Sequence, residues 1–177
     1  KGKGPVHRQK PAVLILEGAL LRRPFDKTLL LRLAHAYVND AKPLSAATLV
    51  HRAAYIDTKL RVEAAELYRR AGKTTLALML NAQVLDQRAK LKQRLGLLIE
   101  ARRFEEAASL ERRLSRLGLL KDQQLVYALA YSYFRIGRFR LAERWLKRVS
   151  KPQLFRKAIE LRRNMAACES QGWMCMR

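Results

Sequence analysis

At 177 residues the chain is near the size of one domain and is long enough to bury a substantial core. Hydrophobic residues make up 49% of it, which excludes an intrinsically disordered chain. Lys and Arg number 37 against 15 Asp and Glu, and only Lys1, Lys3, Arg8 and Lys10 of these cations lie in the first ten residues. The charge of +22 therefore belongs to the folded surface, which we expect to attract acidic proteins, anionic lipid, acidic polymers or nucleic acid.

Apolar residues recur at spacings of three and four from about residue 11 to residue 167, which predicts helices throughout and no strand. Residues 1–10 are expected to form a basic flexible tail, and residues 169–177 a short C-terminal tail. Because the predicted connections are only a few residues long, successive helices should lie antiparallel, in a closed bundle or an open solenoid. The predicted helices are 12–22, 27–39, 43–54, 58–71, 73–86, 88–101, 104–117, 121–136, 138–149 and 153–169.

An internal repeat favours the solenoid. A small residue is needed where two helices approach closely, and it recurs at steps of 31, 30 and 35 residues as Ala46, Ala77, Ala107 and Ala142. Glycine suits the left-handed backbone that ends a helix, so Gly72 and Gly137 are expected to sit in turns. The clearest copy of the repeat has its anchors at Tyr127, Leu129, Ala130, Tyr133, Phe134, Gly137, Phe139, Ala142, Trp145, Leu146, Val149 and Pro152.

This order of a Leu–small pair, an aromatic, Gly, an aromatic, Ala, a large apolar residue and Pro resembles the tetratricopeptide (TPR) repeat, whose period is about 34 residues. The resemblance covers residues 12–168 and implies an all-α, right-handed α-solenoid of antiparallel helical hairpins. About four degenerate repeats plus capping helices would form one repeat domain over residues 11–168. The helix after Pro152 is expected to be a capping helix with a basic outer face at Arg156, Lys157, Arg162 and Arg163.

No catalytic, cofactor-binding or metal-binding constellation stands out, so the chain is predicted not to be an enzyme and to carry no cofactor or metal. Residues 71–75 resemble the end of a phosphate-binding loop, but Leu67 stands where its first glycine belongs. None of His7, His35 and His51 has a carboxylate or cysteine at ligand spacing.

The only cysteines, Cys168 and Cys175, lie near the C-terminus with Gly172 between them. Either they form a disulfide, which would indicate an oxidising compartment such as a periplasm, or they are two free thiols. The chain begins with Lys, so we expect either that a leader has been removed or that the stretch starts inside a longer protein. No apolar run approaches the roughly 20 residues that a transmembrane helix needs.

The resemblance also implies a partner-binding groove lined by the first helix of each hairpin. An aromatic strip followed by a cation fits a peptide with an acidic end, and it fits equally the stacked bases of single-stranded RNA. Two of these rings, Tyr127 and Phe134, fit as well into the core between repeats. The predicted groove residues are Tyr127, Tyr131, Phe134, Arg135, Arg69, Arg70, His35 and Asn39.

The leading hypothesis is a protein–protein interaction scaffold that docks an acidic partner within a multi-protein complex. Its composition and terminal cysteines resemble TPR proteins of bacterial pilus, flagellar, secretion or exopolysaccharide machines, which implies the periplasm or cell envelope; a cytoplasmic location is the alternative. A second hypothesis is an RNA- or DNA-binding helical-repeat protein, and a third is binding of an acidic polysaccharide or peptidoglycan strand. Salt dependence separates these hypotheses, because phosphate contacts weaken steeply as salt rises.

Overall fold

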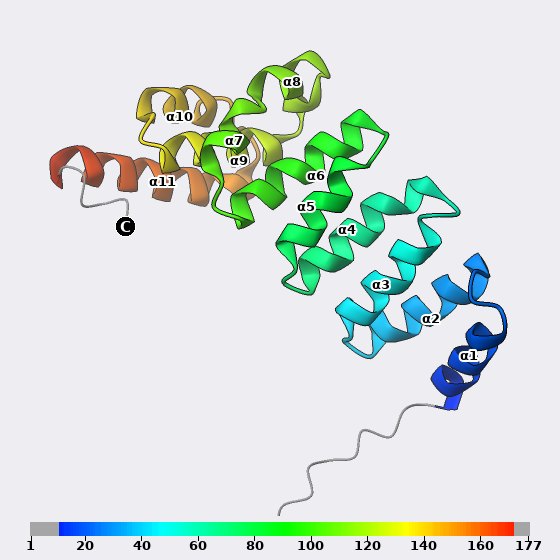
Figure 1. The fold of residues 1–177 in the computed structure, drawn as a ribbon. Coiled ribbons are helices and arrows are strands. Elements are labelled where there is room, and N and C mark those ends of the chain that lie inside the picture. The colour runs from blue at the N-terminus through cyan, green and yellow to red at the C-terminus, as the bar shows by residue number, and fades with distance from the viewer. Residues whose placement is uncertain (1–10, 172–177) are drawn as a thin grey trace, which may run out of the picture. The chain divides into compact units, whose positions relative to one another are not determined.

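The computed structural model describes residues 11–171, and every regular element in that range is a helix (Figure 1). The all-α prediction is confirmed. The chain divides into two compact units, Lys1–Leu85 (unit 1) and Asp86–Arg177 (unit 2). In unit 1 the helices are α1 (Pro11–Arg22), α2 (Lys27–Asn39), α3 (Pro43–Ala53), the 3₁₀ helix η1 (Thr58–Leu60), α4 (Arg61–Arg70) and α5 (Thr74–Ala82). In unit 2 they are α6 (Gln87–Glu100), α7 (Phe104–Ser109), α8 (Glu111–Arg116), the 3₁₀ helix η2 (Leu119–Lys121), α9 (Gln123–Arg135), α10 (Phe139–Leu146) and α11 (Pro152–Gln171).

Each unit contains two helical hairpins, in which we name the first helix A and the second helix B. Unit 1 pairs α2 with α3 and α4 with α5, whereas unit 2 pairs α6 with α7 and α9 with α10. All four hairpins close with the same turn, because one residue in each has a positive φ. These residues are Ala41 (56°), Gly72 (70°), Arg102 (58°) and Gly137 (72°). The left-handed conformation predicted for the two glycines is confirmed.

The hydrogen bonds of these turns explain why the chain reverses there. In the α4–α5 turn the amide of Gly72 donates to the carbonyl of Arg69 (2.9 Å), and the amide of Lys73 donates to that of Tyr68 (2.8 Å). The other three turns repeat both bonds, so the last carbonyls of each helix A are satisfied in the manner of a Schellman motif. Five residues after each positive φ comes a fully buried alanine where helix B meets helix A: Ala46, Ala77, Ala107 and Ala142.

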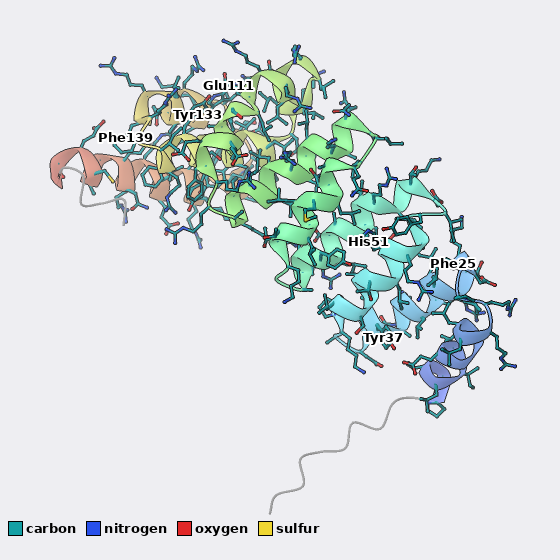
Figure 2. The ribbon with its side chains drawn as sticks, viewed as in Figure 1. Phe25, Tyr37, His51, Glu111, Tyr133 and Phe139 are labelled. Carbon is teal, nitrogen blue, oxygen red and sulfur yellow. The ribbon has the colours of Figure 1, made fainter. Side chains whose placement is uncertain are left out.

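Three of the hairpins are joined to the preceding helix by a tyrosine four residues before the positive φ. Tyr37 donates to the Glu17 carboxylate of α1, the Tyr68 hydroxyl lies 3.2 Å from Nδ1 of His51 in α3, and Tyr133 reaches Glu111 of α8 (Figure 2). Buried Leu98 takes the same place in the α6–α7 hairpin. The hydrogen bond that Tyr37 donates to Glu17, together with burial, raises the pKa of Tyr37 to about 12. Burial, together with the hydrogen bond that Tyr133 donates to Glu111, raises the pKa of this second tyrosine to about 12.

Two predicted helix ranges are corrected by the structure. The predicted helix 104–117 is divided at Leu110, which is buried and bonds to Ala107 three residues back. Neither Gly nor Pro marks this break, so packing determines it. The predicted helix 73–86 ends earlier, because Gln83 and Val84 make bonds of the i→i−3 kind and Asp86 already caps α6.

Candidate partner-binding grooves

The predicted aromatic strip lines a real groove in unit 2. This hollow of about 500 Å³ lies between α9 and α11, and we call it the aromatic groove. The strip reaches it because residues three and four apart share one face of α9. All four residues predicted for this hairpin contribute to its wall. The lining residues are Tyr127, Tyr131, Phe134 and Arg135 from α9, and Lys157, Glu160, Leu161, Asn164, Ala167 and Cys168 from α11.

Arg135 is held in place by the aromatic side chains around it. Its Nη1 donates to the Tyr131 hydroxyl (3.0 Å), and its guanidinium carbon lies 4.4 Å from the ring centroid of Phe104. The ring of Tyr131 meets that of Phe104 edge-on, with centroids 5.9 Å apart, and Phe134 stacks on Phe139 with centroids 5.8 Å apart. A cation fixed over aromatic faces gives up less side-chain freedom when it binds an anion.

The rings divide between core and groove. Phe134 is 8% exposed and packs mainly as core, as one of the two sequence interpretations allowed. Tyr127 and Tyr131 are half-buried, so part of each ring faces the hollow. Burial raises the pKa of Tyr127, with smaller contributions from Tyr131 and Glu160, so its hydroxyl stays protonated and able to donate.

Unit 1 contains a hollow of about 660 Å³ between α2 and α4, which we call the aliphatic groove. Two of the predicted residues, His35 and Arg70, line it. The other two lie elsewhere: Asn39 is exposed at the end of α2, and Arg69 holds Glu66 through Nε (2.8 Å) and Nη2 (2.7 Å). The lining is Leu31, Ala34, His35, Val38, Val50, Lys59, Val62, Glu63, Glu66, Leu67 and Arg70.

Three of the four groove positions of α9 have counterparts of α2 that line the aliphatic groove, and the fourth counterpart, Asn39, lies outside it. Counted back from the positive-φ residue of the turn, the predicted groove positions lie ten, six, three and two residues before it. The side chains at these positions differ in kind, because α2 offers aliphatic and small polar groups where α9 offers rings and a guanidinium. The pairs, unit 1 first, are Leu31 and Tyr127, His35 and Tyr131, Val38 and Phe134, and Asn39 and Arg135.

Sequence reasoning missed the far wall of the aromatic groove. Lys157, Glu160 and Asn164 are exposed residues of α11 at spacings of three and four. Their spacing contained a signal for this wall, but Lys157 was predicted to lie on the outer face of a capping helix, whereas it lines the groove. Phe104, which supports Arg135, was not among the predicted groove residues.

Residues 11–171 hold no group of three or more His, Cys, Asp or Glu placed to bind a metal ion. No helix within this range is long and apolar enough to cross a membrane. Cys168 is buried near the end of α11, whereas Cys175 lies outside the described residues, so the predicted disulfide stays a prediction.

Comparisons with known proteins agree with this architecture. Two solved structures of MamA, a TPR-repeat protein, are similar to the chain. "MamA MSR-1 C2" has a TM-score of 0.60 and 24% identity, covering 86% of each chain. "MamA AMB-1 P212121" has a TM-score of 0.62 and 22% identity, over 81% of this chain and 85% of that one. No family model and no curated protein sequence matches. The chain therefore has the fold of a TPR protein.

Proposed function

We propose that the chain is a non-enzymatic docking scaffold that holds an acidic protein segment in the aromatic groove of unit 2. One observation carries this proposal: Tyr127, Tyr131 and Arg135 converge from α9 on a hollow whose opposite wall supplies Lys157. Half-buried rings offer contact area at small entropic cost, and the two cations select for carboxylates. The groove therefore has the parts that recognition of an extended acidic peptide needs.

A peptide suits this groove better than a nucleic acid strand does. Glu160 lies in the wall beside the two cations, and it would oppose the regular negative charge of a phosphate backbone. Arg135 is also held by Tyr131 and Phe104, which fixes one cation for one anionic group. A single positioned guanidinium fits a carboxylate, whereas a phosphate chain needs a row of cations.

We also propose a place in a bacterial envelope assembly of the pilus, flagellar, secretion or exopolysaccharide kind. Two features support it: the composition resembles that of TPR proteins of such machines, and Cys168 and Cys175 could form a disulfide in an oxidising compartment. Alkylation of native protein before and after reduction, read by mass spectrometry, tests it. Two alkylated cysteines without reduction would remove the argument for an oxidising compartment.

Binding of labelled acidic peptides, followed by fluorescence anisotropy, tests the docking function. The probes are short peptides of Asp and Glu around Phe or Leu, and a single-stranded oligonucleotide of equal charge is run beside them. Tyr131→Ala and Arg135→Gln should each weaken peptide binding about tenfold, or about 1.4 kcal/mol. His35→Ala, at the equivalent position of unit 1, is the matched control and should change little.

The oligonucleotide separates the two hypotheses. If it binds more tightly than the peptides and its affinity falls by orders of magnitude between roughly 50 and 200 mM salt, the chain is a nucleic acid binder. If the peptides bind equally well to the Tyr131→Ala and wild-type chains, the aromatic groove is not the docking site.

A further inference from the structure

Helix α11 carries two apolar stripes, of which only one is buried. The buried stripe packs α11 against unit 2 and consists of Leu154, Ala158, Leu161, Met165 and Cys168. The second stripe follows the same spacing one residue along and consists of Phe155, Ile159 and Ala166, with Arg162 interrupting it. Phe155 and Ile159 are 45% and 56% exposed. The outer face predicted to be basic thus also holds two large apolar side chains.

The position of this second stripe has a counterpart in every hairpin. Helix α11 forms a groove with α9, just as α4 forms a groove with α2. Since α4 is the helix A of its hairpin, α11 corresponds to a helix A as well. In each hairpin, helix A buries a further face against its helix B. Among residues 11–171, α10 borders this stripe at Arg162 and Ala166, whereas Phe155 and Ile159 stay exposed. The second stripe is therefore an acceptor face for a helix.

A second hollow of unit 2, of about 520 Å³, borders this stripe between α10 and α11, and we call it the basic groove. Its floor is apolar, formed by Phe139, Met165 and Ala166, with Phe139 labelled in Figure 2. Four cations and two carboxylates surround the floor: Arg140, Arg144, Lys147, Arg162, Glu143 and Glu169.

The four cations of this rim outnumber its two carboxylates. Nε of Arg162 donates to the two Glu143 carboxylate oxygens at 2.9 and 3.2 Å, and this ion pair joins α10 to α11. The charges of Arg162 and Glu143 therefore neutralise each other. Arg144 forms an ion pair with Glu111, with its Nη2 3.2 Å from Oε1 of that carboxylate. Arg140 of α10 and Lys147, which caps the C-terminal end of this helix, lie seven residues apart and so on one side, both exposed at the edge of the groove. The rim is cationic on the α10 side.

We propose that the basic groove and the second stripe of α11 form a docking surface for an amphipathic helix of a partner protein with an acidic flank. The helix would lie where a helix B lies in a complete hairpin. Its apolar stripe would cover Phe155 and Ile159, and its acids would face Arg140 and Lys147. A second copy of this chain fits poorly, because it would bring a charge of +22 to a cationic rim.

This surface is separate from the aromatic groove. The two hollows share no lining residue, and they lie on opposite flanks of the buried stripe of α11. A partner segment in one leaves the other accessible, so the proposal stands or falls independently of the function proposed above.

The probe is a stapled helical peptide with Leu at positions i and i+4 and Glu on one flank. A copy with Lys in place of each Glu serves as its control. Ile159→Asp and the double variant Arg140→Glu/Lys147→Glu should each weaken binding of the acidic peptide about tenfold or more. The double variant Arg112→Glu/Arg116→Glu makes the same change of charge on α8, away from the groove, and should bind within about twofold of wild type.

Several results would overturn the proposal. One is equal binding of the acidic and basic peptides, and another is binding that Ile159→Asp leaves unchanged while circular dichroism shows an intact fold. Sedimentation of the chain as a dimer that Ile159→Asp dissolves would identify a second copy as the occupant. Anionic vesicles that displace the peptide through the same residues would identify a lipid surface. Retained peptide binding in Tyr131→Ala would support the separation of the two grooves.

Discussion

The grooves of the two units are built on one frame and differ in chemistry. In unit 1 the walls are aliphatic, and Lys59 and Arg70 are offset by Glu63 and Glu66. In unit 2 the walls carry rings, and Arg135 and Lys157 outnumber one carboxylate. The turn and the buried alanine that create the frame are the same in both. The frame therefore sets the positions, and recognition depends on the few side chains placed on them.

The units also differ in how their helices are joined. In unit 1 the Glu17 carboxylate of α1 accepts a hydrogen bond from Tyr37 of α2. In unit 2 Glu111 accepts from the Tyr133 hydroxyl (2.5 Å), from Nε1–H of Trp145 (3.2 Å) and from Arg144 (3.2 Å). One carboxylate thus joins α8 to both helices of the next hairpin. We expect it to matter more than its counterpart.

Replacing this carboxylate should give the largest effect. Glu111→Ala leaves the donors of Tyr133 and Trp145, both buried, without their acceptor, so unit 2 should lose about 2–3 kcal/mol of unfolding free energy. The matched variant Glu17→Ala should cost unit 1 about 1 kcal/mol. Urea denaturation of both variants measures the difference. Equal losses of unfolding free energy would show that the two carboxylates contribute equally. The contrast between the units would then lie only in their grooves.

Exchanging the groove residues tests the comparison directly. The double variant Tyr131→His/Arg135→Asn gives α9 the side chains of α2, and it should weaken acidic-peptide binding about tenfold to a hundredfold, or about 1.4–2.7 kcal/mol. The reverse variant, His35→Tyr/Asn39→Arg, should create weaker binding in unit 1, because Glu63 and Glu66 remain in that groove. Anisotropy titration measures the peptide affinity of both variants. If the reverse variant bound as tightly as the wild-type aromatic groove, the wall that α11 supplies would contribute nothing to binding.

The turns allow a comparison within each unit. Gly72→Ala and Gly137→Ala put a Cβ on a left-handed backbone and should each cost about 1 kcal/mol. Ala41→Gly and Arg102→Gly relieve that strain and should each stabilise by up to about 1 kcal/mol. Urea melts of the four variants check the signs. Destabilisation by Ala41→Gly would show that the entropy of the unfolded chain outweighs the strain of the turn.

These turns also show what the sequence could predict. The glycine turns and the recurring alanines were visible, and with them the hairpins and the register of α9. The predicted helix ranges also place turns around Ala41 and Arg102, but not the left-handed backbone there, because neither residue is typical of that conformation. The five-residue spacing from each turn to its alanine is the signal that would have identified these two residues.

The rest of the site depended on tertiary contacts that periodicity does not contain. The division of 104–117 at Leu110 follows from packing and has no Gly or Pro to announce it. The pairing of Arg69 with Glu66, three residues apart on one helix, was visible in principle, yet the groove register suggested a free cation. The second stripe of α11 was masked by the basic residues that interrupt it.

The smallest predicted effect is a difference between the two units in how their stability depends on pH. All three histidines of the sequence precede residue 86, so unit 2 has none. Burial lowers the pKa of His51 below its usual 6.5, and the nearby charge of Arg61 lowers it further. Tyr55 stacks on the ring at 5.5 Å, and the Tyr68 hydroxyl lies 3.2 Å from Nδ1.

The unfolded chain therefore binds a proton at His51 more readily than the folded chain does. The stability that this provides is fully present above pH 6.5 and falls as the pH drops through that value. Hydrogen exchange of α3 and α4, corrected for intrinsic rates, should show a loss below about 1 kcal/mol between roughly pH 7 and pH 5, while α9 and α10 change less. His51→Gln keeps a polar group near Tyr68 without the titration, so it should remove the difference between the units. A loss that persists in His51→Gln would have to come from carboxylates, and the contrast in pH response would then not belong to the histidine.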